Sequence, residues 1–219
     1  MYKLFLTRHG ETIWNTERRM QGHNNSPLSE LGIKQANWLF DRLKDENIDV
    51  VLSSPLGRAL QTADVLISNR AIEIVIVDEL KEINLGCWEG CRSEVVERDF
   101  PHEYYCFWNE PHNYVPIDGE SFEELKKRAK YFLHTILPKY KEKNVLIVAH
   151  AVVIKVLLNV IETKGEISRL WEGTPIFPTS LSTLKVKNDK IQIDCIGDTS
   201  HYKEKLKSGW FSEEELDQK

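Results

Sequence analysis

The sequence predicts an α/β protein with a doubly wound, mostly parallel sheet layered between helices and a small aromatic-rich cap insertion. Runs rich in Val, Ile and Leu, with little alternation, lie at residues 2–7, 49–53, 73–77 and 144–149. Strands buried on both faces of a parallel sheet have this composition. Helical patterns separate the runs, and strands that alternate with helices are typical of a layered α/β fold.

Three helix starts can be placed from capping residues. Ser29 is expected to cap a first helix, and Ser54 followed by Pro55 predicts the N-cap and first position of a second. Ser121 and Glu124 have the spacing of a capping box that opens a third. Apolar residues follow the first and third caps at helical intervals: Leu31, Ala36, Leu39, Phe40 and Leu43, then Phe122, Leu125, Ala129, Phe132 and Ile136.

The last third of the domain predicts a buried helix and a hairpin. Residues 152–161 continue the apolar run of the fourth strand with helical spacing. Residues 180–186 and 190–196 read as two strands joined at Asn188 and Asp189.

We expect one domain over residues 1–201, followed by a charged tail at 202–219 in which Trp210 and Phe211 are candidate anchors. A cap insertion at about 83–119 interrupts the alternation. It concentrates aromatic side chains that either pack the insertion or line a pocket: Trp88, Phe100, Tyr104, Tyr105, Phe107, Trp108 and Tyr114.

Composition excludes several classes of partner. The net charge is −5, and the basic residues are interspersed with acidic ones, so no nucleic-acid-binding face is expected. The most apolar stretch, 145–161, carries His150, Lys155 and Asn159, which argues against a membrane span. No membrane partner is therefore expected.

A cytoplasmic location is expected on two grounds. Residues 1–3 lead directly into a strand and lack the features of a signal peptide. The four cysteines are too few for a disulfide scaffold and lack the paired spacing of a zinc site: Cys87, Cys91, Cys106 and Cys195.

Chemistry-bearing side chains follow each of the four parallel strands. Arg8 and His9 follow the first strand, and Arg58 comes soon after the second. Glu82 follows the third and His150 the fourth. Ligands of open α/β sheets bind beyond the carboxyl ends of the strands, so these five side chains are expected to converge on one site.

The expected ligand is a phosphate-sized oxyanion. Arg58 falls in the first turn of its helix, where the helix dipole disfavours a cation unless an anion binds beside it. Guanidinium groups suit such an anion. The chain has no P-loop motif, and arginines next to the two histidines disfavour zinc, so no metal is expected.

Around such an anion, a neutral His9 would be a nucleophile directed at phosphorus. Phosphoryl transfer through a phosphohistidine is then the expected reaction class. Glu82 would protonate the departing alkoxide and later deprotonate the attacking water.

The chain resembles the histidine phosphatase (phosphoglycerate mutase-like) superfamily, most closely its broad-specificity phosphatase branch. The resemblance is carried by RHGET at 8–12, SSPLGRALQTA at 53–63, LKE at 80–82, GCWEG at 86–90 and VAH at 148–150. It implies the roles given above, no cofactor, and a phosphate site completed by Asn15, Gln21 and Gly22. The chain departs from the family pattern at Ala149 and Ala151, where Ser or Thr and Gly are usual.

The expected activity is metal-independent hydrolysis of a small-molecule phosphate monoester. Two alternatives stay open: a phosphoglycerate mutase dependent on 2,3-bisphosphoglycerate, and a regulatory protein on the same fold that binds phosphate esters. Between residues 90 and 119 the full cations are Arg92 and Arg98, which favours a less charged substrate and hence the phosphatase. The oligomeric state stays open, a homodimer included.

Overall fold

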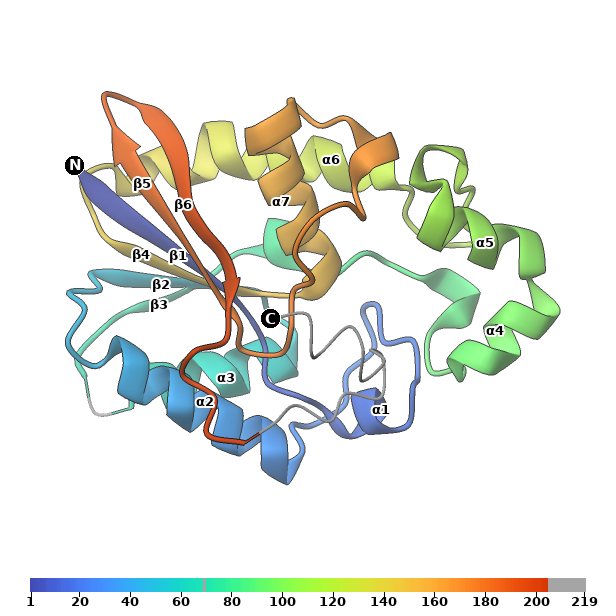
Figure 1. Cartoon of the computed structure of the whole chain (residues 1–219), viewed down its shortest axis with the longest axis horizontal. Helices are drawn as coiled ribbons and strands as arrows, with labels where there is room; N and C mark the ends of the chain where they lie inside the picture. The colour runs from blue at the N-terminus through green and yellow to red at the C-terminus, as the bar shows by residue number, and fades with distance from the viewer. Residues whose placement is uncertain (69, 205–219) are drawn as a thin grey trace.

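The computed structural model describes residues 1–68 and 70–204. Its sheet contains six strands in the order β3-β2-β4-β1-β5-β6 (Figure 1). The four strands β3, β2, β4 and β1 run parallel, whereas β5 and β6 pair antiparallel. The strands span Tyr2–Arg8 (β1), Val50–Ser53 (β2), Ile74–Ile76 (β3), Val145–Ala149 (β4), Leu181–Lys187 (β5) and Lys190–Asp198 (β6). The predicted fold class is confirmed, with each strand within two residues of its expected bounds.

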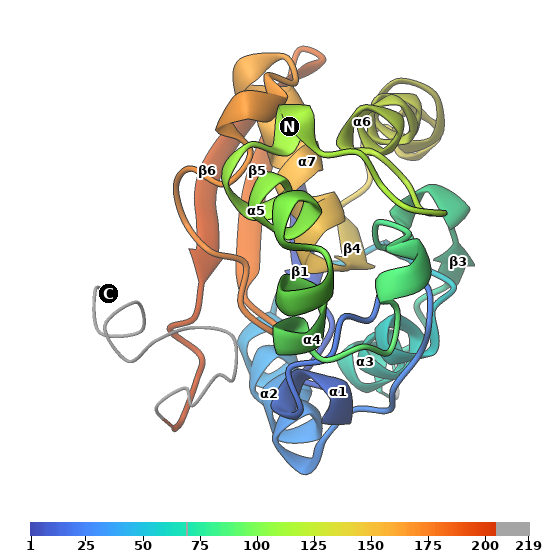
Figure 2. The ribbon, with the colours of Figure 1, turned by 90° about the vertical axis from the view of Figure 1, so that its right-hand side faces the viewer.

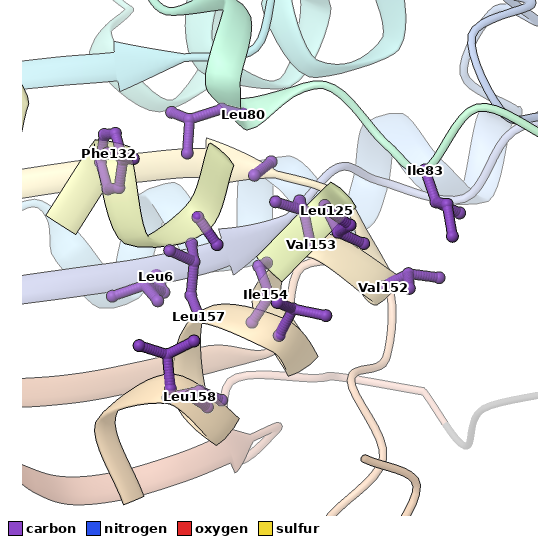
Figure 3. Close-up of a cluster of buried hydrophobic side chains, with 14 of the residues drawn as sticks. Leu6, Leu80, Ile83, Leu125, Phe132, Val152, Val153, Ile154, Leu157 and Leu158 are labelled. Carbon is purple, nitrogen blue, oxygen red and sulfur yellow. The ribbon is translucent and has the colours of Figure 1, made fainter. Parts of the chain in front are cut away.

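Helices cover both faces of the sheet (Figure 1). Helices α2 (Glu30–Leu43) and α3 (Gly57–Ile67) bury one face, and α6 (Phe122–Tyr131) and α7 (Ala151–Thr163) bury the other. Figure 3 shows the second cluster, in which Leu80 and Ile83 point toward side chains of α6 and α7. Helix α6 continues into a π-helical turn at Phe132–Ile136 and a 3-10 turn at Leu137–Tyr140.

The remaining short helices lie beyond the carboxyl ends of the parallel strands. Figure 2 looks at the molecule from this side, with α1 (Ile13–Thr16), α4 (Ser93–Asp99) and α5 (Pro101–Asn109) in front. Further 3-10 turns span Asp78–Leu80, Gly86–Trp88, Pro111–Asn113 and Ile167–Arg169. None of the described helices has the length and apolar character that crossing a bilayer requires.

Two of the three predicted helix starts are confirmed. Ser29 Oγ accepts a hydrogen bond from the Gly32 amide at 3.0 Å. Ser121 and Glu124 form the expected capping box, with Glu124 N donating to Ser121 Oγ at 3.3 Å and Ser121 N donating to Glu124 Oε2 at 2.9 Å.

The start predicted at Ser54 and Pro55 is wrong, because α3 begins at Gly57 with Leu56 as its N-cap. Ser54 still belongs to the sheet edge, where its amide donates to Val148 O at 3.0 Å. Its hydroxyl lies 2.8 Å from Nε2 of His150, one of the side chains expected to converge beyond the strand ends.

Residues 83–119, the cap segment, contain the helices α4 and α5. Their aromatic rings serve both expected uses, and Phe107 serves the two at once. Trp88 and Phe107 are buried with ring centroids 5.8 Å apart, and Tyr114 packs 5.1 Å from Phe107. Tyr104, Phe107 and Trp108 reach a cavity at the ends of the strands.

The first residue of the predicted tail is packed rather than loose. The Tyr202 hydroxyl donates to Pro178 O, and its ring lies 6.1 Å from that of Trp38. Residues 205–219, which include Trp210 and Phe211, lie outside the described part of the chain.

Candidate active site

The two site histidines follow neighbouring parallel strands. Arg8 of β1 pairs with Ala149 of β4, so His9 and His150 are the next residues on adjacent strands. The His9 amide donates to Ala149 O at 3.0 Å. The two imidazole centroids are therefore only 5.1 Å apart, with a tilt of 58°.

The hydrogen-bond partners of His9 define its tautomer. Nδ1 lies 2.7 Å from Gly10 O, and a carbonyl only accepts, so Nδ1 carries the proton. Nε2 therefore holds the lone pair, and it accepts a hydrogen bond from Arg58 Nε at 3.2 Å. Burial, reinforced by the charges of Arg58 and Arg8, holds the pKa of His9 well below its usual value. The imidazole is neutral at neutral pH.

Arg58 is anchored by a loop around Gly22. Its NH1 donates to Asn24 O and its NH2 to Gly22 O, both at 2.7 Å, and its amide donates to Asn25 Oδ1 at 3.0 Å. Burial lowers the pKa of Arg58 to about 10, which still leaves the guanidinium charged at neutral pH. Gly22 has φ +53°, which favours glycine, and a Cβ there would lie 2.2 Å from Glu89 Oε1, so any side chain would displace the Glu89 carboxylate.

Glu89 holds this loop, a role that sequence reasoning missed. Its carboxylate accepts from the amides of His23 at 2.7 Å, Asn24 at 2.9 Å and Leu85 at 3.2 Å. The cap segment thereby positions the carbonyls that hold Arg58. The GCWEG motif contains the residue, but its spacing does not reveal a partner some 65 residues earlier in the chain.

Arg8, Asn15 and Gln21 line the same cavity. Arg8 donates from NH1 to Ile176 O at 3.0 Å, and burial lowers its pKa. Asn15 Oδ1 accepts from both the amide and the hydroxyl of Thr12 at 3.0 Å, which orients the side chain. Arg8 Nε and Gln21 Oε1 are buried polar atoms with no partner in the described part of the chain.

Glu82 caps helix α7 from another part of the chain. Its Oε2 accepts from the Val152 amide and its Oε1 from the Val153 amide, each at 3.2 Å. Oε1 also accepts from the Ile83 amide at 3.0 Å. Helix α7 has no side-chain cap from its own N-cap, His150, so Glu82 satisfies amides that the helix leaves free.

His150 is buried against His9 and does not itself line the cavity. Its Nε2 lies 2.8 Å from Ser54 Oγ, while its Nδ1 has no partner among the described residues. Burial, together with the charge of Arg58, holds the pKa of His150 well below its usual value. A Ser54 hydroxyl that donates to Nε2 would leave a proton on Nδ1 for an anion.

The cavity measures about 440 Å³ and combines cations with apolar walls. Arg92 and Arg98 do not line it, so the small number of cations in the cap segment does not determine the charge of the cavity. Three other cations do line it: Arg18, Arg19 and Lys155. The apolar lining consists of Met20, Ile83, Leu85, Tyr104, Phe107, Trp108, Val152, Trp171, Pro175 and Ile176, with Ala151 beside them.

These side chains place positive charge and the lone pair of His9 Nε2 around one cavity. Among residues 1–68 and 70–204, no group of three or more His, Cys, Asp or Glu is arranged to hold a metal ion. The donor-bearing side chains that line the cavity include guanidinium, ammonium and amide groups, which suit a phosphoryl group.

Comparison with known proteins agrees with this geometry. Residues 4–199 match the model of the histidine phosphatase superfamily, branch 1. Phosphoserine phosphatase 1 of Hydrogenobacter thermophilus is 36% identical over 152 residues, which cover 69% of this chain and 72% of that protein. A metal-independent phosphoserine phosphatase of Arabidopsis thaliana is 32% identical over 203 residues, 91% of this chain and 82% of that protein.

A solved structure is similar over the same range. Bacillus stearothermophilus YhfR matches with a TM-score of 0.88 at 37% identity, covering 92% of this chain and 99% of that chain. The chain belongs to the histidine phosphatase superfamily, and it is a phosphomonoesterase. The predicted family and activity are confirmed, in preference to the mutase and the regulatory protein.

Proposed function

We propose that the chain hydrolyses small-molecule phosphate monoesters without a metal ion, through a phosphohistidine on His9. The observation that carries the proposal is the lone pair on His9 Nε2, which a proton on Nδ1 and a low pKa keep available. Arg8 and Arg58 lie beside it, so an incoming phosphoryl group meets two cations and a nucleophile.

In the first step, His9 Nε2 attacks phosphorus and the bond from phosphorus to the ester oxygen breaks. The electron pair of that bond goes to the leaving oxygen, which takes a proton from Glu82 and departs as the alcohol. Arg8, Arg58 and His150 bind the phosphoryl oxygens, with Asn15, Gln21 and Gly22 around them. The positive charges of Arg8 and Arg58 stabilise the oxygens as negative charge develops.

In the second step, water attacks phosphorus and the bond to Nε2 breaks, which returns its electron pair to His9. The Glu82 carboxylate left by the first step takes the proton from this water. Inorganic phosphate then leaves, and the enzyme regains its starting protonation state.

We place the ester's organic group against the aromatic side of the cavity, toward Trp108. Two relatives carry the name phosphoserine phosphatase, and phosphoserine presents a carboxylate to which Arg18 and Lys155 offer positive charge at the cavity wall. Phosphoserine and aryl phosphates are the substrates we favour.

A cytoplasmic location and a single domain over residues 1–201 belong to the same proposal. The four cysteines are free thiols in the structure, as a reducing compartment would keep them. We propose neither a nucleic acid nor a membrane as a partner.

The deciding assay follows release of phosphate from phosphoserine and p-nitrophenyl phosphate in excess chelator. Turnover that chelation leaves unchanged supports the proposal. Turnover that disappears with chelator and returns with a divalent cation would overturn its metal-independent part.

A further inference from the structure

Arg128 of α6 uses every N–H of its guanidinium, although it lies outside the cavity lining. NH1 donates to Glu79 O and to Lys81 O, both at 2.7 Å, and NH2 donates to Glu82 O at 2.9 Å. Nε donates to Glu120 Oε1 at 2.7 Å, and NH2 also donates to Glu120 Oε2 at 2.8 Å. A guanidinium has five N–H donors, so none remains for solvent.

Three of these acceptors are main-chain carbonyls within the four-residue stretch that ends at Glu82. A charged donor to a carbonyl is stronger than a neutral one, and the planar guanidinium fixes the direction of each bond. The His23 ring also contributes, with Nε2 2.9 Å from the same Glu82 carbonyl. The backbone of Glu82 is thus held from two sides.

Glu120 adds hydrogen bonds to the backbone that follows Glu82. Its amide donates to Asn84 O at 2.7 Å, and its Oε2 accepts from the Asn84 amide at 3.3 Å. The ion pair between Arg128 and Glu120 is largely buried, with side-chain exposures of 20% and 16%. It therefore links the stretch before Glu82 to the stretch after it.

Apolar packing alone does not fix the orientation of this turn. Leu80 and Ile83 are both fully buried in the cluster shown in Figure 3, and they keep the segment in the core. Such contacts are non-directional, whereas the Glu82 carboxyl must reach a leaving oxygen with hydrogen-bond accuracy. Loss of Arg128 is therefore expected to loosen the turn without unfolding the domain.

We propose that Arg128, together with Glu120, is a positioning residue that holds Glu82 in place to protonate the leaving group. The inference rests on the acid role of Glu82 in the proposed function. It assigns to α6, which contributes no residue to the cavity lining, a part in the protonation step.

The test compares kcat/KM for a poor and a good leaving group in Arg128→Met, Arg128→Lys and Glu120→Gln. For Arg128→Met we expect a loss of at least about 10-fold on phosphoserine, but less than about 3-fold on p-nitrophenyl phosphate, whose leaving group needs little protonation. Arg128→Lys keeps the charge and should recover part of the phosphoserine activity. Glu120→Gln should show the same selectivity as Arg128→Met, to a smaller degree.

Lys126→Met is the matched control on the same helix. Lys126 also binds a carboxylate and a carbonyl, at Glu123 Oε1 over 2.6 Å and Gly165 O over 3.3 Å, but does not touch the Glu82 turn. It should lower both kcat/KM values equally or not at all. Thermal unfolding of each variant shows how much folded protein each assay contains.

Glu82→Gln, measured alongside, separates the two ways of failing. If Glu82→Gln loses more activity on phosphoserine than on p-nitrophenyl phosphate while the folded Arg128 variants lose both equally, the positioning role alone is overturned. A Glu82→Gln variant that loses both substrates equally removes the acid role, and the inference fails with it.

Discussion

Arg58 Nε donates to His9 Nε2 across 3.2 Å, so the guanidinium covers the lone pair that the proposed mechanism uses. An arriving phosphoryl group must displace this hydrogen bond, and its oxygens are better acceptors for Arg58 than an imidazole nitrogen. Substrate binding would then release the nucleophile as it engages the cation.

His9→Ala is expected to abolish covalent labelling and to remove most of the turnover. When the protein without the substitution reacts briefly with a 32P-labelled monoester and is then denatured, it should keep a label that is acid-labile and base-stable. A phosphoramidate has these properties. His112→Ala, an exposed histidine in the cap segment, is the control and should keep the label. Normal turnover in His9→Ala would contradict the assignment.

Ser54→Ala should weaken phosphate binding, because it removes the 2.8 Å partner of His150 Nε2. Without this hydroxyl the proton is no longer held on His150 Nδ1, and the hydrogen bond from Nδ1 to a charged phosphate, worth about 1.5–3 kcal/mol, is lost. The inhibition constant for inorganic phosphate should then rise about 10- to 150-fold. Ser53→Ala is the matched control, since its equally buried hydroxyl donates to Ser54 O and does not contact His150. An unchanged inhibition constant in Ser54→Ala would remove Ser54 from the site.

The free energy of unfolding should fall as the pH drops below about 6.5, in part because of His201. Burial lowers the pKa of His201 from 6.5 to about 4, against the opposing effect of Asp198. Between pH 6.5 and about 4, His201 is therefore protonated in the unfolded chain but neutral in the folded chain. This group's contribution is complete above pH 6.5 and is lost as the pH falls toward about 4.

Urea denaturation at several pH values between 4.5 and 7 measures how the free energy of unfolding changes with pH. One such group contributes a slope of up to about 1.4 kcal/mol per pH unit. His201→Leu should have a shallower pH dependence than the parent by about this amount. His9 and His150, whose pKa values are also lowered, should keep the remaining slope positive. Parallel curves for the two proteins would show that His201 does not titrate as described.

Trp108→Ala should reduce kcat/KM for bulky aryl phosphates by about 10-fold and for phosphoserine by much less, because the lost apolar area contacts only the larger group. Trp108 lines the cavity, with its ring centroid 5.0 Å from that of Trp171. Tyr105→Ala, an exposed aromatic on the same helix that does not line the cavity, is the comparison. Equal losses on both substrates would place the ester's organic group elsewhere.

The sequence predicted the fold well because strand and helix patterns are local. The strands at residues 2–7 and 144–149 lie within a residue of β1 and β4, and the capping residues Ser29 and Ser121 act as expected. Ser54 shows the limit of such local rules. A serine before a proline has the composition of a helix cap, yet its hydroxyl partners a histidine 96 residues away.

The site was predicted as a set of side chains at strand ends, and the structure brings these side chains together. The residues that hold them were not predicted, because their partners are main-chain atoms distant in sequence. Glu89 binds amides near residue 23, and Arg128 binds carbonyls near residue 81. The charge of the pocket was misjudged for a related reason, since Arg18 and Lys155 reach it from outside the cap segment.

The pairing of Arg8 with Ala149 has a consequence for how this enzyme could change its substrates. The spacing of the two imidazoles is set by the register of two core strands, whereas the aromatic wall comes largely from the cap segment. A strand slip would abolish the chemistry, because it would turn one histidine to the opposite face. Cap insertions or deletions leave that register untouched, so the reaction can stay constant while the accepted esters diversify.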